Sequence, residues 1–171
     1  MITVARVSLN FKKIVINSFI YFGICFSSYV YATDYTISNG TTQTSRVTLT
    51  NNDTLTVDNG GEIDYTWPAV DADNRTFPAG TTTITNNGII EGNCCVIDIR
   101  SSTNPKLINN GTINGKSSSR TIYANNSVNA TIINNGDITI LGSSNYETID
   151  GDSSSGLTIT NNSGATISSE G

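Results

Sequence analysis

The sequence predicts an all-β fold: a parallel β-helix, or solenoid, of about five rungs that follows an N-terminal signal peptide. The first observation behind this prediction is a repeated Asn-Asn-Gly tripeptide at residues 86–88, 109–111 and 134–136, with an isoleucine one or two residues before each copy. The steps between copies are 23 and 25 residues, and outlying copies stand at Asn59 and Asn162. A period of this length with β-prone residues is typical of a fold that stacks one coil on the next.

A second repeat follows the first at similar distances. Ile97, Ile122 and Ile149 are 25 and 27 residues apart and lie in short β-prone runs. Each unit therefore offers three short strands: one before Asn-Asn-Gly, one after it, and one around this later isoleucine. Three sides per unit is the plan of a parallel β-helix in which every strand pairs with its copies above and below at about 4.8 Å.

The repeat also predicts what fills the interior. Equivalent isoleucines should stack into aliphatic columns, and an inward asparagine can form an amide ladder with the asparagine of the next rung. We expect Asn-Asn-Gly to form a corner with left-handed backbone angles, which Asn tolerates and Gly adopts at no steric cost. The alternative is a β-hairpin with Asn-Gly at its tight turn, which explains each turn but not the common step.

The first 32 residues have the plan of a secretory signal peptide. Arg6, Lys12 and Lys13 precede an apolar run over 14–31, and Ala32 supplies a small residue for processing. An uncleaved membrane anchor is the alternative, because the run approaches the roughly 20 residues that span a bilayer. Export would place the protein at the cell surface, in the outer membrane or outside the cell.

The repeat region is 59–171. Between the signal and this region, we expect residues 33–58 to form irregular strands that cap the N-terminal end of the stack. A stretch at about 65–80 breaks the pattern and holds Trp67, the only tryptophan, with Tyr65 and Phe77 nearby. We expect a loop here, and its aromatic side chains are candidates for a contact surface. They could instead fold over the open end of the stack.

Cys94 and Cys95 are adjacent, and Cys25 belongs to the signal peptide. Neighbouring residues on a strand point to opposite faces, so we expect one sulfur inside and the other toward solvent. A disulfide between them would be strained relative to the usual geometry. The simpler interpretation is that the two cysteines serve as small apolar side chains with no catalytic role.

The composition excludes several functions. The formal charge is −5 and becomes −8 once the three basic residues of the signal are removed, which disfavours binding to nucleic acid. The chain has no histidine, so Ser-His-Asp and Cys-His catalysis and most zinc sites are excluded. We predict no catalytic, cofactor-binding or metal-binding residues and no cofactor. Residues 58–64 resemble a calcium β-roll repeat only faintly and once.

Carboxylates are the one feature that favours an enzyme. Asp98 and Asp150 occupy equivalent positions of the repeat with Tyr123 between them, and paired carboxylates could cleave glycans by acid and base catalysis. Repetition alone brings such residues close together, however, so the pair does not by itself define a site.

The reiterated Ile-Asn-Asn-Gly-x-Ile pattern behind a signal sequence resembles the passenger region of bacterial type V autotransporters, over 59–171 and more loosely over 33–58. The resemblance implies a right-handed β-helix carried across the outer membrane by a C-terminal β-barrel. The sequence stops at Gly171 without the alternating strands of a barrel. A truncated or split gene product, with a separate outer-membrane barrel as partner, is the simplest expectation, and a separately secreted short β-helix is the alternative.

Three functions follow from the sequence. The first is an exported, non-catalytic structural or adhesive segment that binds a protein or glycan on a host or bacterial surface. The second is a small polysaccharide-active enzyme that uses Asp98 and Asp150. The third is a non-functional remnant of a longer gene.

Overall fold

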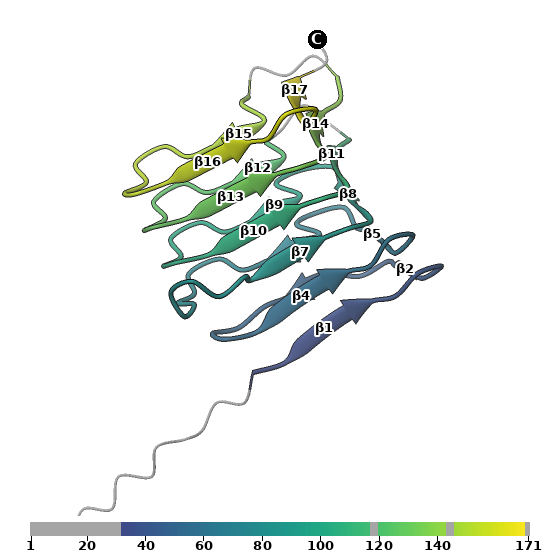
Figure 1. Cartoon of the computed structure of the whole chain (residues 1–171), viewed down its shortest axis with the longest axis horizontal. Coiled ribbons are helices and arrows are strands. Elements are labelled where there is room, and N and C mark those ends of the chain that lie inside the picture. Colours follow the sequence, from purple (N-terminus) through teal and green to yellow (C-terminus); the bar gives the residue numbers. More distant parts are fainter. Residues whose placement is uncertain (1–31, 117–119, 143–145, 170–171) are drawn as a thin grey trace, which may run out of the picture. The chain divides into compact units, whose positions relative to one another are not determined.

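The computed structural model describes residues 32–116, 120–142 and 146–169 as one unit made of parallel β-strands. The signal peptide predicted at 1–32 lies outside this part except for its last residue, so it stays a prediction. Figure 1 shows the strands climbing in layers, and the unit is a parallel β-solenoid. The described residues form five complete coils of three strands each and two strands of a sixth coil.

Each coil contributes one strand to each of three parallel sheets, A, B and C. Sheet A consists of β1 (Asp34–Ile37), β4 (Thr54–Val57), β7 (Ile84–Asn86), β10 (Lys106–Asn109), β13 (Thr131–Asn134) and β16 (Thr158–Asn161). Sheet B consists of β2 (Thr42–Gln43), β5 (Glu62–Asp64), β8 (Ile89–Gly92), β11 (Thr112–Gly115), β14 (Asp137–Ile140) and β17 (Thr166–Ser169). Sheet C consists of β3 (Val47–Thr48), β6 (Val70–Asp71), β9 (Ile97–Asp98), β12 (Ile122–Tyr123) and β15 (Ile149–Asp150).

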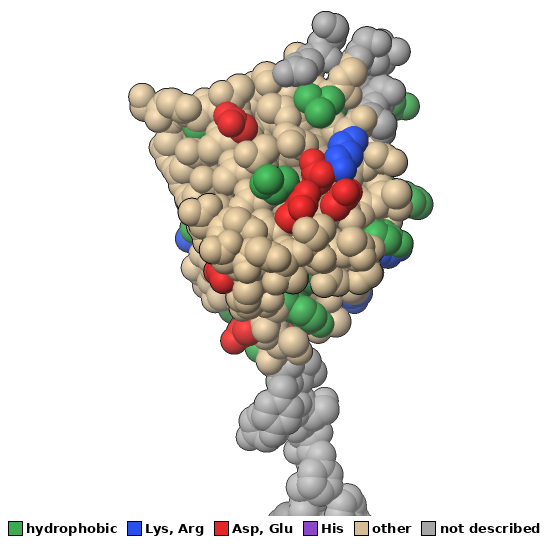
Figure 2. Space-filling model, turned by 90° about the vertical axis from the view of Figure 1, so that its right-hand side faces the viewer, with side chains coloured by type: hydrophobic (Ala, Val, Ile, Leu, Met, Phe, Trp, Pro, Cys, Tyr) green, Lys and Arg blue, Asp and Glu red, His purple; other side chains and the backbone are tan. Residues whose placement is uncertain are grey.

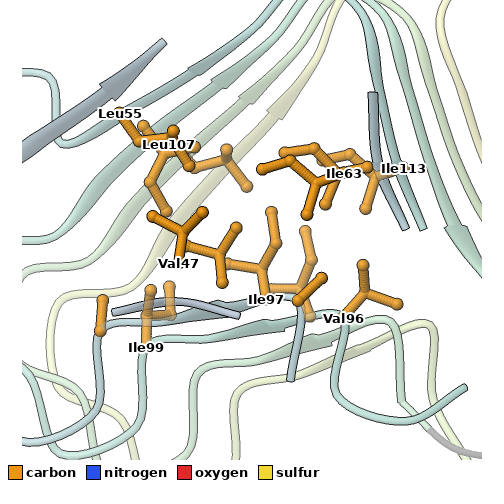
Figure 3. Packing of buried hydrophobic residues seen from close by; sticks show 14 of the residues in the cluster. Val47, Leu55, Ile63, Val96, Ile97, Ile99, Leu107 and Ile113 are labelled. Atoms are coloured by element: carbon orange, nitrogen blue, oxygen red, sulfur yellow. The ribbon is translucent and has the colours of Figure 1, made fainter. Parts of the chain in front are cut away.

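The core is made of aliphatic columns, as the repeat predicts. In sheet B, one column runs along the axis through Ile63, Ile90, Ile113, Ile138 and Ile167. Its first four members are completely buried. Figure 3 shows that side chains from all three sheets meet in one interior. A column needs its neighbouring coils, because each isoleucine is covered mainly by its copies above and below.

Two amide ladders run beside these columns at the corner between sheets A and B. In the inner ladder, Nδ2 of Asn86, Asn109 and Asn134 donates to Oδ1 of the equivalent residue in the next coil at 2.8 Å; the last acceptor is Asn161. The first three of these residues are completely buried. The expected inward asparagine ladder is therefore confirmed.

The reason for glycine at this corner differs from the one the sequence suggested. Gly88, Gly111 and Gly136 do not have positive φ angles, and neither do the asparagines before them. A Cβ atom at Gly111 would instead overlap the carbonyl oxygen of Gly88, and one at Gly136 would overlap that of Gly111. The three glycines are needed because successive backbones pass too closely for any side chain.

Left-handed backbone occurs at other turns of the solenoid. Gly60 and Gly164 adopt it in longer turns between sheets A and B, and a group of asparagine and serine residues adopts it between sheets C and A. The members of this group are Asn52, Asn74, Ser101, Asn104, Asn126, Asn129 and Ser153. The prediction that Asn tolerates left-handed angles thus applies here and was wrong for Asn-Asn-Gly.

Two segments expected to be irregular contain regular strands. Residues 33–58 hold β1 to β4, and β1 pairs with β4 in register from Asp34↔Thr54 to Ile37↔Val57. The expected loop at 65–80 contains β6, where Val70 is completely buried between Val47 and Ile97. The proline and aromatic residues on both sides of this two-residue strand led to the prediction of a loop, but Val70 continues the aliphatic column of sheet C.

Candidate functional site

The outer face of sheet C holds a ladder of charged and aromatic side chains. Register places Thr48, Asp71, Asp98, Tyr123 and Asp150 in one column, one residue from each coil. The preceding residue of each strand points into the core, because neighbouring residues of a strand face opposite sides. We call this column, with the arginine and tyrosine side chains that contact it, the sheet C ladder.

Every aspartate of the sheet C ladder pairs with an arginine. Arg46 Nη1 lies 3.0 Å from Asp71 Oδ2, and Arg100 Nη2 lies 2.8 Å from Asp98 Oδ2. Arg120 forms the equivalent ion pair with Asp150 through its Nε atom. The side chains of Asp98 and Asp150 are each only 4% exposed, so the arginines shield them from solvent.

The guanidinium groups also stack on tyrosine rings. Arg100 and Arg120 both lie 4.8 Å from the ring centroid of Tyr123, and Arg120 lies at the same distance from Tyr146. A cation over an aromatic face is attracted by about 0.5–1 kcal/mol at an exposed site. The outer surface of the ladder is thus a continuous stack of planar groups with guanidinium donors at its rim.

Burial raises the pKa of the Asp98 carboxyl, and the hydrogen bonds and charge of Arg100 act against this rise. For Arg100, burial lowers the pKa, but the hydrogen bond and charge of Asp98 outweigh it and the net pKa is raised. Two donors of Arg100, the backbone N–H at 3.1 Å and Nε at 3.0 Å, converge on Asp98 Oδ1. Because these charge-assisted bonds favour the ionised carboxylate, we assign the pair as ionised at neutral pH.

The structure keeps Asp98 and Asp150 on one face but separates them by a coil. Tyr123 pairs with both in register, and its ring lies between Arg100 and Arg120. Each carboxylate is bound to its own arginine. No pocket is present over the described ranges 32–116, 120–142 and 146–169.

The three aromatic residues expected to share a loop separate. Phe77 is 2% exposed and packs in the core, and Tyr65 is half-buried against it. Trp67 is 56% exposed at the corner between sheets B and C. Tyr146, 48% exposed, lies at the same corner three coils further along, where its ring ends the stack that runs through Arg120.

A second charged group lies on the outer face of sheet B. The carboxylates of Glu62, Asp64 and Glu91 have oxygens within 4.8 Å of one another. Lys116 Nζ lies 2.9 Å from Asp64 Oδ1 and 2.5 Å from Glu91 Oε1, and Thr42 donates to Glu62 at 2.9 Å. Figure 2 shows acidic side chains gathered beside a basic one on this face. The lysine ammonium already balances part of the charge that a cation would neutralise.

Cys94 and Cys95 do not point to opposite faces as expected for a strand. Both lie between β8 and β9, and their sulfurs are 3.1 Å apart. Cys95 has φ of 47°, a left-handed conformation that turns its side chain toward that of Cys94. The strand assumption was wrong here because the corner falls on these two residues.

Sequence reasoning found Asp98, Tyr123 and Asp150 but missed their partners. Arg100 stands two residues after Asp98, and its backbone N–H donates to Asp98 Oδ1. The same bond joins the backbone N–H of Asp73 to Asp71 and that of Asp152 to Asp150. An aspartate that ends a short strand and binds the N–H two residues on is a recurrent turn. Arg120 and Tyr146 come from the opposite corner and have no sequence signal, because the coils differ in length.

Comparison with protein-family models, with curated proteins and with solved structures gives no match for this chain. Within the described residues, no helix is long and apolar enough to span a membrane.

Proposed function

We propose that this chain is an exported, non-catalytic β-solenoid of a cell-surface protein of the autotransporter passenger type, and that it binds a surface ligand, protein or glycan, through the sheet C ladder. The observation that carries the proposal is the planar stack of Arg100, Tyr123, Arg120 and Tyr146, with successive groups 4.8 Å apart. Tyrosine, tryptophan and arginine are enriched where proteins bind partners.

The arrangement of charge supports binding rather than catalysis. The ladder shields its carboxylates under guanidinium groups, so what reaches solvent is aromatic rings and N–H donors. Rigid flat groups lose little conformational entropy on binding, because ion pairs and ring contacts already fix them. The signal-like segment at 1–32 and the repeat supply the export and presentation parts of the proposal.

The test is binding of the purified chain to cultured cells and to arrayed acidic and neutral glycans. A double variant, Trp67→Ala with Tyr146→Ala, removes the exposed ring at the end of the planar stack and the exposed tryptophan at the same corner, and it leaves the core columns intact. We expect it to lose about tenfold or more in affinity, since aromatic anchors dominate interface energies. Ile89→Ala is the matched control, because Ile89 is 40% exposed on sheet B.

Two outcomes would contradict the proposal. One is binding no stronger than that of a chain with the same composition and a scrambled repeat. The other is an equal loss in the Ile89→Ala control. Export is tested separately by sequencing the N-terminus of secreted protein, where cleavage after Ala32 is expected.

A further inference from the structure

We propose that Cys94 and Cys95 are a modification site: their two thiols are oxidised to a disulfide between adjacent residues by exchange with a low-molecular-weight disulfide. The pair lies at the corner between sheets B and C, in the same region as Trp67 and Arg120. This inference goes beyond ligand binding, because it concerns a covalent change in the chain itself.

The two sulfurs lie close together on one side of the backbone. Both cysteines are thiols, and their Sγ atoms are 3.1 Å apart, so they must approach by only about 1 Å to reach the 2.05 Å of a disulfide bond. In an extended strand, neighbouring side chains point to opposite faces and could not meet. Here the left-handed φ of 47° at Cys95 places both side chains on one side of the backbone.

Hydrogen bonds to the neighbouring coils hold this unusual conformation. Asn93 N donates to Thr66 O at 3.0 Å in the preceding coil, and Cys95 N donates to Arg120 O at 2.8 Å in the following coil. The Cα atoms of adjacent residues are about 3.8 Å apart, below the 4.4–6.8 Å usual for disulfides, so a flexible chain forms this ring with difficulty. The fold therefore already imposes part of the backbone order that ring closure requires.

The different burial of the two thiols sets the order of the two exchange steps. Cys95 is 6% exposed and Cys94 is half-buried, so the reagent reaches Cys94 first. Burial raises the pKa of Cys95 to about 12, with the hydrogen bond to Cys94 as a further cause. Because only a thiolate attacks a disulfide, Cys94 is the better first nucleophile and Cys95 the resolving thiol.

Oxidation of the pair takes two thiol–disulfide exchange steps. The Cys94 thiolate attacks R–S–S–R, forms a mixed disulfide and releases one RS⁻. The Cys95 thiolate then attacks the Cys94 sulfur, forms the Cys94–Cys95 bond and releases a second RS⁻. The protein loses two electrons and two protons; the reagent gains both and leaves as two RSH. Export to an oxidising compartment would supply such a reagent, and the test below does not depend on export.

The experiment uses the full chain with Cys25→Ser, so that only the adjacent pair remains. The protein is equilibrated with oxidised and reduced glutathione, blocked with iodoacetamide and digested with trypsin. Both cysteines fall in the peptide 76–100, between Arg75 and Arg100. We expect this peptide from the oxidised protein to be two hydrogens lighter than its reduced form and to resist alkylation. The folded chain should reach this state at a ratio of oxidised to reduced glutathione about tenfold or more below the ratio that the urea-unfolded chain needs.

Two single variants complete the design. In Cys95→Ser, the resolving thiol is missing, so the glutathione adduct on Cys94 should persist. Trp67 is the only tryptophan and hydrogen-bonds Cys95, so its fluorescence should fall on oxidation of the pair and not in Cys95→Ser. The proposal is overturned if the folded chain keeps the glutathione adduct or both alkylated thiols, or if ring closure needs the same ratio in urea.

Discussion

Asn109 and Asn110 are neighbours in the sequence and donate their side-chain hydrogen bonds in opposite directions along the solenoid axis. Asn109 Nδ2 donates to Asn134 Oδ1 in the next coil, whereas Asn110 Nδ2 donates to Asn87 Oδ1 in the preceding coil, both at 2.8 Å. Backbone groups fix the inner orientation, because Asn109 Nδ2 also donates to the carbonyl of Asp137 at 3.1 Å. The two ladders differ in burial, so they should differ in energy.

The first prediction compares Asn109→Ala with Asn110→Ala. Asn109 is completely buried, and its loss removes a donor and an acceptor from groups that water cannot reach. A buried polar group left without its partner costs about 1–3 kcal/mol, so we expect Asn109→Ala to lower the free energy of unfolding by about 3 kcal/mol. Asn110 is exposed, and its substitution should cost less than about 1 kcal/mol. Urea unfolding measures both, and equal losses would mean that burial does not set the strength of a ladder.

The repeat predicted the fold well because periodicity and β-propensity act together at every coil. An isoleucine and an asparagine recur at equivalent positions of successive coils. Their spacing predicts the length of a coil, the aliphatic columns and the inner asparagine ladder. Strands at 33–58 were predicted, but their regular pairing and the strand β6 were not, because these segments lack that pattern: Val57 takes the place of the ladder asparagine in the second coil. Its aliphatic side chain fits the column but carries no repeat signal.

The candidate site was predictable only in part. Residues in register, such as Asp98 and Asp150, are found by aligning coils. Arg120 and Tyr146 approach them from corners of unequal length, so alignment does not bring them together. The left-handed angle at Cys95 depends on hydrogen bonds to two other coils, which local sequence cannot show.

The second prediction concerns the close approach of glycines at the corner between sheets A and B. Gly111→Ala would drive a methyl group into the carbonyl oxygen of Gly88, and a backbone atom cannot rotate away. We expect a loss of about 3 kcal/mol or more, at the upper end of overpacking effects. Gly142→Ala is the comparison: it has open space within 4 Å but φ of 92°, so only backbone strain of about 1–2 kcal/mol should appear. If Gly142→Ala proved the more damaging, the steric account of this corner would be wrong.

The third prediction is a pH dependence that arises from Asp53. This residue is 2% exposed, and its carboxylate accepts the backbone N–H of Thr33 and of Thr50, each at 2.7 Å, and the Thr50 hydroxyl at 2.8 Å. Burial alone would raise the pKa of Asp53, but these hydrogen bonds hold it below the ordinary 3.8. A carboxyl with a lowered pKa in the folded state stabilises the fold above pH 3.8, and this contribution disappears as the pH falls through the folded-state pKa.

Asp53→Asn should therefore lose about 2 kcal/mol at neutral pH, the range for hydrogen bonds to a charged group. The difference from the parent chain should shrink once the pH falls below 3.8. Urea unfolding at several pH values measures it, and the contributions of other carboxylates cancel in the difference. Asp152→Asn, at an exposed position, provides the control and should match the parent chain throughout. A difference for Asp53→Asn that stays constant in acid would exclude the charge as its source.

The fourth prediction tests whether the sheet C ladder depends on the face of Tyr123. Arg100 and Arg120 each stack on this ring at 4.8 Å, so its removal in Tyr123→Ala takes away two cation–π contacts. At about 0.5–1 kcal/mol each, the expected loss in unfolding free energy is about 1–2 kcal/mol. Tyr123→Phe keeps the aromatic face and should stay within about 0.5 kcal/mol of the parent chain. Urea unfolding compares the two variants. Because Arg120 supplies one of the two cation–π contacts, Arg120→Gln should remove about half of the difference between Tyr123 and Ala. An equal loss in Tyr123→Phe and Tyr123→Ala would instead assign the effect to the phenolic hydroxyl, and the stack would then be a consequence of the ion pairs rather than a source of stability.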